Sequence, residues 1–413
     1  MDIDIYCETV QEKEGKFCTQ MRTNILKIFY VMVMILAGAS TANAYDFDQD
    51  GLYYNILSED DCTVAVFGDK NYNGDMEIPK EILYNSKTYT VTTIGEGAFS
   101  HCSGLTSVDI PNSVTTIGDD AFFDCNGLTS VVIPNSVTTI GEGAFSNCSG
   151  LTSVEIPSSV TSIGESAFFD CNGLTSVKIP NSVTTIGMAA FYGCSGLTSV
   201  VIPNSVTTIG MAAFSHCSGL TSVEIPSSVT TIGREAFFVC SGLTSVVIPS
   251  SVTSIGDEAF SGCSGLTSVT IPSSVASIGD DVFKYCSSLE SVYCQWTDPI
   301  ECNPQFPDVV IKNAALYVPK GAIGNYEKVD PWRNFKNIKE MDYTAGVEDV
   351  ADRSGADVKV TEGCIVAEGC AEMEVYSMSG QLVYRGAGRA ENLAAGIYVV
   401  RVADKTLKVM VAR

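Results

Sequence analysis

The chain has 413 residues and carries 48 acidic against 24 basic side chains, which gives a formal net charge of −24. A surface this acidic repels nucleic acid and anionic lipid, so the composition predicts neither as a partner. The length allows two or three domains.

Residues 1–44 have the pattern of a secretory signal peptide. Arg22 and Lys27 precede a short apolar run, and small residues follow as far as Ala44. The run is shorter than the roughly 20 residues of a membrane span, so we expect cleavage after Ala44 and no membrane-spanning segment in the mature chain. Met21 is the expected true start, because the residues before it are too acidic for the beginning of a signal peptide.

Residues 45–93 are expected to form an N-terminal cap. The stretch "LYYNI" has a strand pattern, and a second strand is expected to end at Ile78-Pro79. A hairpin is expected around Asn85 and Ser86.

The cap opens with an acidic stretch that resembles the start of a calcium-binding loop. Asp46, Asp48, Asp50 and Gly51 have the required spacing, but the twelfth position holds Leu57. A calcium loop needs a glutamate there, so the sequence favours a solvated edge and predicts no metal site.

The middle of the chain repeats every 23 residues. Each repeat contains an isoleucine followed by a glycine. These isoleucines are Ile94, Ile117, Ile140, Ile163, Ile186, Ile209, Ile232, Ile255 and Ile278. A phenylalanine, a cysteine and a leucine follow each of them at five, eight and eleven residues. A fixed period of this length is the signature of a solenoid, in which each unit buries its apolar edge against its neighbours.

One repeat is expected to contain two short strands and a turn. The stretch "LTSVDIP" predicts a strand with alternating inward residues, which proline ends because it lacks an N–H donor. The stretch "VTTIG" predicts a second extended piece, and Gly118 is expected to supply the freedom to turn. The segment with Ala121, Phe122 and Cys125 fits one helical turn.

The Leu-x-x-Val-x-Ile core, with Ile-Gly, Ala-Phe and Cys in these phases, resembles the leucine-rich repeats of the BspA-like family of bacterial surface proteins. The resemblance covers residues 94–293 and implies a mainly β leucine-rich repeat solenoid of nine coils, with short parallel strands and short helical turns. Residues 294–342 resemble the family's C-terminal cap. The resemblance also implies a secreted or surface-displayed protein, often an adhesin or host-matrix binder, that has no catalytic site and no cofactor.

Residues 343–413 lose the repeat and predict a small β-sandwich. Its strands are expected at 358–361, 373–378, 382–384, 397–402 and 407–411. The stretches "VYSMSGQLVYRG", "LAAGIYVVRV" and "KTLKVMV" resemble the C-terminal sorting domain of type IX secretion substrates. That resemblance implies export across the outer membrane, while an ordinary accessory β-domain remains the alternative.

The repeat cysteines and the two histidines are the residues that could form a metal, disulfide or nucleophilic site. The nine repeat cysteines, from Cys102 to Cys286, lack the clustered pairs of a metal site, and we expect a ladder of buried free thiols. Cys294 with Cys302, or Cys364 with Cys370, are better candidates for disulfides.

The two histidines, His101 and His216, occupy one variable phase of the repeat. His101 precedes Cys102, but adjacent residues on a turn diverge, so the sequence favours no nucleophilic pair and no enzyme.

Binding specificity is expected in the one outward position of each first strand that varies. This row comprises Asp109, Val132, Glu155, Lys178, Val201, Glu224, Val247, Thr270 and Tyr293. A long, shallow row suits an extended partner, either an extracellular protein or a glycan, better than a small ligand. The alternative is that the row is simply solvated. A second variable row is expected on the opposite rim. It comprises Glu96, Asp119, Glu142, Glu165, Met188, Met211, Arg234, Asp257 and Asp280.

The sequence therefore predicts an extended, exported interaction scaffold. The resemblances imply, in addition, a bacterial protein, secreted or associated with the outer-membrane surface, that mediates adhesion or macromolecular recognition. A periplasmic or envelope scaffold without host binding is the alternative.

Overall fold

A computed structural model describes residues 45–68, 71–303, 306–341, 357–361, 364–368, 373–377, 382–391, 393, 396–402 and 405–411. The chain separates into two units, 1–46 and 47–413, and all the elements named below lie in the second. The expected signal peptide lies outside the described residues. Among the residues that are described, no helix has the length and apolar character of a membrane span.

The N-terminal part consists of a three-stranded antiparallel meander and a hairpin whose second strand joins the solenoid. Its strands are β1 (Phe47–Gln49), β2 (Leu52–Ser58), β3 (Thr63–Phe67), β5 (Glu81–Tyr84) and β6 (Lys87–Ile94). Asp50 and Gly51, with φ of 52° and 87°, form the two-residue turn of the β1–β2 hairpin, so the acidic stretch is a hairpin and Leu57 lies within β2. The hairpin expected around Asn85 and Ser86 is confirmed, because β5 pairs with β6 across these two residues.

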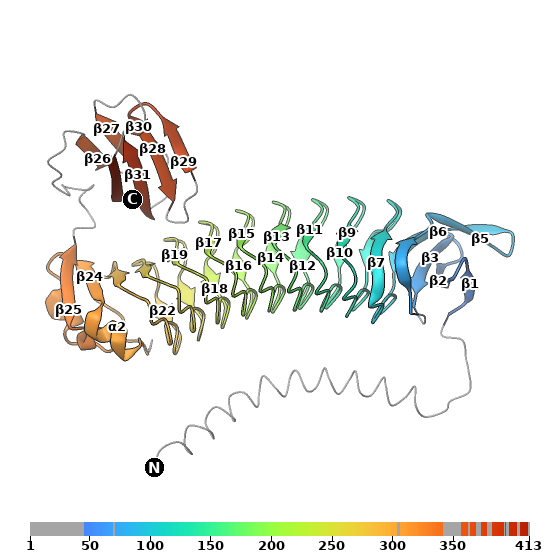
Figure 1. Cartoon of the computed structure of the whole chain (residues 1–413), viewed down its shortest axis with the longest axis horizontal. Coiled ribbons are helices and arrows are strands. Elements are labelled where there is room, and N and C mark those ends of the chain that lie inside the picture. Colours follow the sequence, from blue (N-terminus) through green and yellow to red (C-terminus); the bar gives the residue numbers. More distant parts are fainter. Residues whose placement is uncertain are drawn as a thin grey trace, which may run out of the picture. The chain divides into compact units, whose positions relative to one another are not determined.

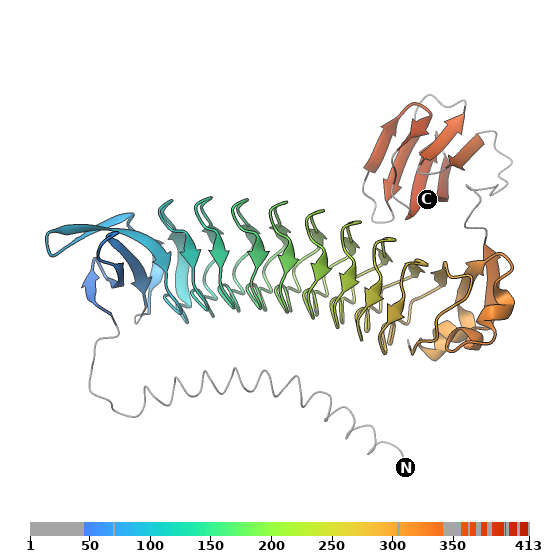
Figure 2. The same cartoon turned by 180° about the vertical axis from the view of Figure 1, so that it is seen from behind.

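The repeats form two parallel strand ladders, visible as successive rungs in Figures 1 and 2. The first ladder comprises β4 (Asn73–Glu77), β7 (Gly104–Asp109), β9 (Ser130–Val132), β11 (Ser153–Glu155), β13 (Ser176–Lys178), β15 (Ser199–Val201), β17 (Ser222–Glu224), β19 (Ser245–Val247), β21 (Ser268–Ile271), β23 (Ser291–Cys294), β24 (Ala315–Pro319) and β25 (Asn337–Met341). The second ladder continues from β6 through β8 (Thr116–Ile117), β10 (Thr139–Ile140), β12 (Ser162–Ile163), β14 (Thr185–Ile186), β16 (Thr208–Ile209), β18 (Thr231–Ile232), β20 (Ser254–Ile255) and β22 (Ser277–Ile278). Each ladder is divided into two hydrogen-bonded sheets, between β9 and β11 in the first ladder and between β10 and β12 in the second. The predicted β solenoid is confirmed, with about twelve turns once the cap strands are included.

Identical side chains stack along the core, as the period predicts. The phenylalanine column runs from Phe99 to Phe283 with nearly parallel rings, whose centroids lie 5.1 Å apart at the first step and 6.0 Å apart at the last. All of these rings are fully buried. The column continues to Phe306, which packs against Trp332 at 5.9 Å. Trp332 therefore covers the C-terminal end of the core.

The predicted ladder of free, buried thiols is confirmed. All nine repeat cysteines are free and fully buried. The Sγ of Cys125 donates to the Phe99 carbonyl at 3.0 Å, and the same contact recurs in each rung as far as Cys286 and Phe260. Burial raises the pKa of Cys240 to about 12, which keeps that thiol protonated and able to donate.

The segment between the two strands of a rung differs from the expected single helical turn. Two residues of each rung have positive φ, as at Asp120 and Asp124 with 51° and 58°. A right-handed helical turn excludes this conformation, so the segment forms stacked turns instead. Each stacked turn binds the next rung through the backbone, as where the Phe122 N–H donates to the Ala144 carbonyl at 2.8 Å.

One left-handed position carries an unsuitable residue. Val239 has a φ of 55°, whereas sister rungs place Asn147 or Gly193 there. A β-branched residue is strained in this conformation by about 1–2 kcal/mol. We therefore expect Val239→Asn to raise the free energy of unfolding by about 1 kcal/mol, measured by chemical denaturation. The reciprocal Asn147→Val should lower it by a similar amount, and a gain in stability from that change would contradict the strain.

The C-terminal cap contains the only α-helices among the described residues, α2 (Asp308–Asn313) and α3 (Ile323–Tyr326), and a 3-10 turn, η1 (Trp332–Asn334). The disulfide expected between Cys294 and Cys302 is wrong, because both thiols are free. Cys294 pairs in register with Ile271 and is fully buried, so it fills the core position that isoleucine has in other rungs.

The C-terminal region forms two small antiparallel sheets, which confirms the β prediction. Their strands are β26 (Asp357–Thr361), β27 (Cys364–Glu368), β28 (Met373–Ser377), β29 (Leu382–Gly386), β30 (Arg389–Ala390), β31 (Gly396–Val402) and β32 (Lys405–Val411). The sequence missed β27 and β30. Ile365 and Val375, from different sheets, share one core. Cys370, the expected partner of Cys364, lies outside the described residues.

Candidate functional site

The outward row of the first ladder is in register from rung to rung within each of the ladder's two sheets. Glu155 pairs in register with Lys178, Lys178 with Val201, and Val201 with Glu224. The same register continues to Tyr293 at the C-terminal end. The strand ladder therefore places the predicted residues side by side on one face, which we call the sheet face.

The sheet face extends further than the sequence indicated. Glu77 pairs with Asp109 at one end, and Tyr317 and Lys339 continue the row beyond Tyr293 at the other. The 23-residue period could not find these positions, because the spacing changes in both caps. The stretch "ALYVP" did carry a signal, since it has the inward alternation and terminal proline of a repeat strand.

Exposure varies along the sheet face. Val132 and Val201 leave 75% and 72% of their surface accessible, and Asp109, Glu155, Lys178 and Glu224 are also exposed. Val247 and Tyr293 are partly buried, and Thr270 is only 9% exposed. The accessible part of the predicted row therefore lies mainly between β7 and β17.

The side chains beside this row are committed to the fold. The Oγ1 of Thr152 donates to the Thr129 carbonyl at 3.3 Å, and Thr175 donates to Thr152 at 3.1 Å. Because these threonines repeat one contact, they offer a uniform surface, and the side chains that differ from rung to rung are those of the row. Within that row, Lys178 and Glu155 form an exposed ion pair with a nitrogen–oxygen distance of 2.5 Å.

The second variable row lies on the turn segments, which we call the turn face. Some of its acids hold the next rung, as where the Asp119 carboxylate accepts the Glu142 N–H at 2.8 Å. Burial and the neighbouring Glu142 raise the pKa of Asp120 to about 6. In the described parts of the chain, no three histidine, cysteine or acidic side chains are grouped as metal ligands would be.

The structure separates the side chains of His101 and Cys102, the candidate nucleophilic pair. The His101 Nδ1 lies 3.0 Å from a carboxylate oxygen of Asp124 on the turn face, while Cys102 is fully buried. His216 has a different partner, the Ser215 hydroxyl, 2.9 Å from its Nδ1. Ser215 is fully buried and its hydroxyl also donates to the Phe238 carbonyl, so this serine is held as a structural donor.

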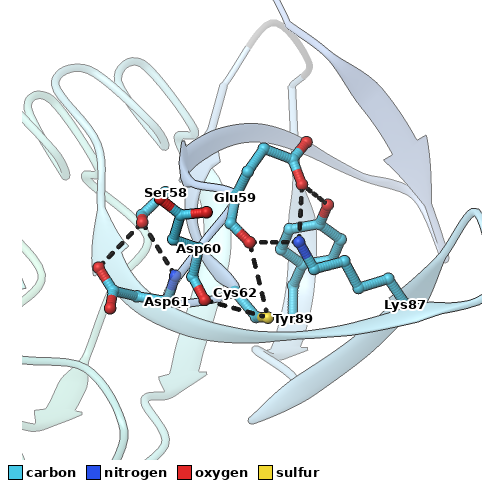
Figure 3. Close-up of polar contacts among 7 residues, drawn as sticks. All are labelled: Ser58, Glu59, Asp60, Asp61, Cys62, Lys87 and Tyr89. Atoms are coloured by element: carbon cyan, nitrogen blue, oxygen red, sulfur yellow. Dashed lines mark hydrogen bonds and ion pairs between the residues drawn. The ribbon is translucent and has the colours of Figure 1, made fainter.

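A polar cluster that the sequence did not indicate lies in the N-terminal cap (Figure 3). The Glu59 carboxylate accepts from Lys87 at 2.8 Å and from the Tyr89 hydroxyl at 2.5 Å. The Ser58 hydroxyl donates to Asp61 at 2.9 Å in the same turn. The Lys87 contact, then the Tyr89 contact, lowers the pKa of Glu59, and Glu59 raises the pKa of Lys87. Both groups are held in their charged forms, which is the opposite of what acid–base catalysis at neutral pH requires.

We expect Lys87→Met to raise the pKa of Glu59 toward its ordinary range, measured by NMR titration of the side-chain carboxyl. Because folding lowers this pKa, the stabilisation is complete above the ordinary glutamate value of about 4.3 and is lost as the pH falls through the folded value. The stability difference from the unaltered protein should thus be present at neutral pH and disappear in acid. Lys80→Met is the control, because Lys80 forms an exposed ion pair with Glu81, at 3.3 Å, and not with Glu59. An unchanged Glu59 titration would contradict the assignment.

The stacked rungs, with leucine, valine and isoleucine inward from each strand, define a leucine-rich repeat solenoid. A family model described as "BspA type Leucine rich repeat region (6 copies)" matches residues 80–198 and 184–297. These ranges cover more than half of the chain, which therefore belongs to the BspA-type leucine-rich repeat family.

The chain also matches solved structures from several bacteria. A leucine rich cell surface protein from Faecalibacterium prausnitzii is 27% identical over 73% of this chain and 96% of that chain, with a TM-score of 0.40. A leucine-rich repeat protein from Bacteroides ovatus is 25% identical over 72% of this chain and 100% of that chain, with a TM-score of 0.39. A leucine-rich repeat protein from Eubacterium ventriosum is 25% identical over 65% of this chain and 82% of that chain, with a TM-score of 0.40. No curated protein matches the chain.

Proposed function

We propose that this protein is an exported, cell-surface leucine-rich repeat protein that recognises an extended extracellular protein or glycan through the sheet face. The observation that carries the proposal is the row of varying, exposed side chains, in register from Glu155 to Glu224 and set in uniform threonine and serine ladders. A shallow row of this kind gives many small contacts along a chain and no deep pocket for a small ligand. We assign it no catalytic role, since leucine-rich repeat solenoids typically serve as recognition scaffolds.

The test of the binding surface is a charge reversal in the exposed row. Lys178→Glu should weaken adhesion of the purified protein to a panel of immobilised matrix proteins and glycans, with a loss of at least severalfold at the ligand it prefers. Lys312→Glu on α2 is the matched control, because it makes the same charge change outside the sheet face. Equal losses from both variants would mean that binding follows net charge alone.

The location is tested by brief protease treatment of intact cells. If the protein is on the cell surface, the protease should digest its solenoid. A solenoid that resists digestion on intact cells would overturn surface recognition and favour the alternative, an envelope scaffold.

We also infer that residues 343–413 act as a type IX sorting domain. The resemblance of its three quoted stretches supports this, together with its small antiparallel sheets, which have a hydrophobic cluster of their own. Sequencing both ends of the mature protein tests it. Loss of residues 1–44 and of the C-terminal sheets is expected, and an intact C-terminus would favour an accessory domain.

A further inference from the structure

The first strand ladder ends in an edge strand on each side. Among the described strands, β4 pairs only with β7 at the N-terminal end, and β25 pairs only with β24 at the C-terminal end. Both edge strands have five residues, and both run parallel to their single neighbour. The backbone N–H and C=O groups on the outer side of an edge strand form a template for pairing with another chain.

The two edges lie at opposite ends of the stack of rungs, as the positions of β7 and β25 in Figure 1 show. They can therefore meet only when they belong to different molecules. A second copy placed in line with the first brings its β4 beside β25 of the first, with the same strand direction. The junction then repeats the parallel pairing that joins the rungs within one chain.

The register of the ladder determines which outward side chains meet at such a junction. Glu77 ends the sheet face on β4, where it pairs with Asp109. Lys339 ends the sheet face on β25, where it pairs with Tyr317. Both end residues are exposed. Continuing the row from one copy to the next places a carboxylate opposite an ammonium group, and cross-strand pairs of opposite charge stabilise a sheet.

The inward column beside this row ends in an apolar side chain at each edge. Met76 pairs with Val108, and Ile338 pairs with Leu316. Both end residues are only partly buried, whereas Val108 is 5% and Leu316 is 0% exposed. In the in-line arrangement Met76 and Ile338 cover each other, as successive valines do inside the solenoid, and this burial of apolar surface favours the contact.

The other charged groups of the two edges are held within their own chain. The Asp75 carboxylate accepts two hydroxyl groups from β7, at 2.7 and 2.6 Å. The Glu340 carboxylate accepts the Gly321 N–H at 3.0 Å. Glu77 and Lys339 are thus the charges that select the partner. Pairing of two β4 strands would instead bring their acidic side chains together, which disfavours contact between equal edges.

We propose that the partner of both edges is a second copy of this chain, and that β25 of one copy pairs in parallel with β4 of the next. This head-to-tail contact uses two different surfaces, so each added copy presents a further edge and the assembly grows. The sheet face then continues from one copy to the next. The contact does not depend on what the sheet face binds.

The test is a charge swap, followed by sedimentation velocity of the full chain from micromolar to millimolar concentration. Physiological ionic strength screens the general repulsion between these acidic chains. The unaltered protein should form species that grow with concentration. Glu77→Lys and Lys339→Glu should each weaken this association by about two- to thirtyfold, because each places like charges opposite one another.

Complementation of the two variants identifies the junction. An equimolar mixture of Glu77→Lys and Lys339→Glu should regain the association, because each chain then meets the opposite charge on the other. The protein that carries both changes should regain it alone. Glu81→Lys is the matched control, because it makes the same charge change in the same cap but on β5, and it should not weaken the association.

Three results would overturn the proposal. One is a protein that stays monomeric up to millimolar concentration or stops at a dimer. Another is an equal loss of association from Glu77→Lys and Glu81→Lys. The third is a mixture of the two swapped variants that associates no better than either variant alone. Circular dichroism of each variant confirms that the fold is retained.

Discussion

Replacing Phe191 by alanine is expected to lower the free energy of unfolding by about 3–5 kcal/mol. The ring is fully buried and stacks between Phe168 and Phe214, with each centroid 5.4 Å away. The change therefore removes two ring contacts and leaves a cavity in the middle of the core. The cavity cannot close easily, because the backbone N–H groups of Phe168 and Phe191 each bind the next rung at 2.8 Å.

The measurement is chemical denaturation followed by two signals. Circular dichroism reports the strand ladders, and fluorescence reports the C-terminal cap, because the chain's 2 tryptophans, Trp296 and Trp332, both lie there. Tyr192→Ala is the control, since the adjacent ring is partly exposed and its loss should cost less than about 1 kcal/mol. Similar losses from both variants would show that the phenylalanine column does not hold the rungs together.

In a solenoid each rung contacts only its neighbours, so a weak rung can also divide the molecule. We expect the two signals to coincide in the unaltered solenoid and to separate after Phe191→Ala. The half that contains the cap would then unfold apart from the other half.

The inward columns could be predicted because their chemistry is visible in residue type. Leucine, phenylalanine and cysteine at fixed phases have one common environment, and the structure buries all three. The outward row was equally accessible to reasoning, because alternation in a strand assigns each residue to one face. Tyr317 was not predicted as part of this row, because its position follows from the spacing of the cap and not from the 23-residue period.

Backbone conformation was harder to predict, because different residues share one geometry. The left-handed position of Val239 holds histidine, aspartate, asparagine and glycine in other rungs, so no single residue type marked it. The stacked rings of Phe169 and Tyr192 were missed for a related reason. Phe169 and Tyr192 are ordinary apolar residues one period apart, and only the stacking of rungs brings their rings together.

The sequence indicated the wrong reason for the glycine that follows the isoleucine in each repeat. Gly118 was expected to provide freedom to turn, but it is not among the glycines with positive φ. A Cβ atom there would lie 2.9 Å from the Glu96 backbone nitrogen and 3.0 Å from the Ile94 carbonyl oxygen. The glycine is required because consecutive rungs approach each other at this point more closely than a side chain allows.

Gly210→Ala is therefore expected to destabilise the solenoid by about 1–3 kcal/mol or more, although the change adds only one methyl group. Its Cβ would lie 2.6 Å from the Ile186 carbonyl oxygen and 2.8 Å from the Gly187 carbonyl carbon. Both are backbone atoms, and the Gly210 N–H donates to the same Ile186 carbonyl at 3.2 Å. The rungs can separate only by giving up that hydrogen bond, so the strain has no inexpensive release.

The same substitution should have the opposite sign where the space is open. Gly324 lies in α3, and a Cβ there would meet nothing within 4 Å. Alanine favours helix over glycine by up to about 1 kcal/mol, so Gly324→Ala should be neutral or slightly stabilising. Denaturation of both variants under one set of conditions separates steric contact between rungs from any general effect of removing a glycine. A Gly210→Ala protein as stable as the unaltered chain would mean that the rungs are spaced more widely than the glycine column requires.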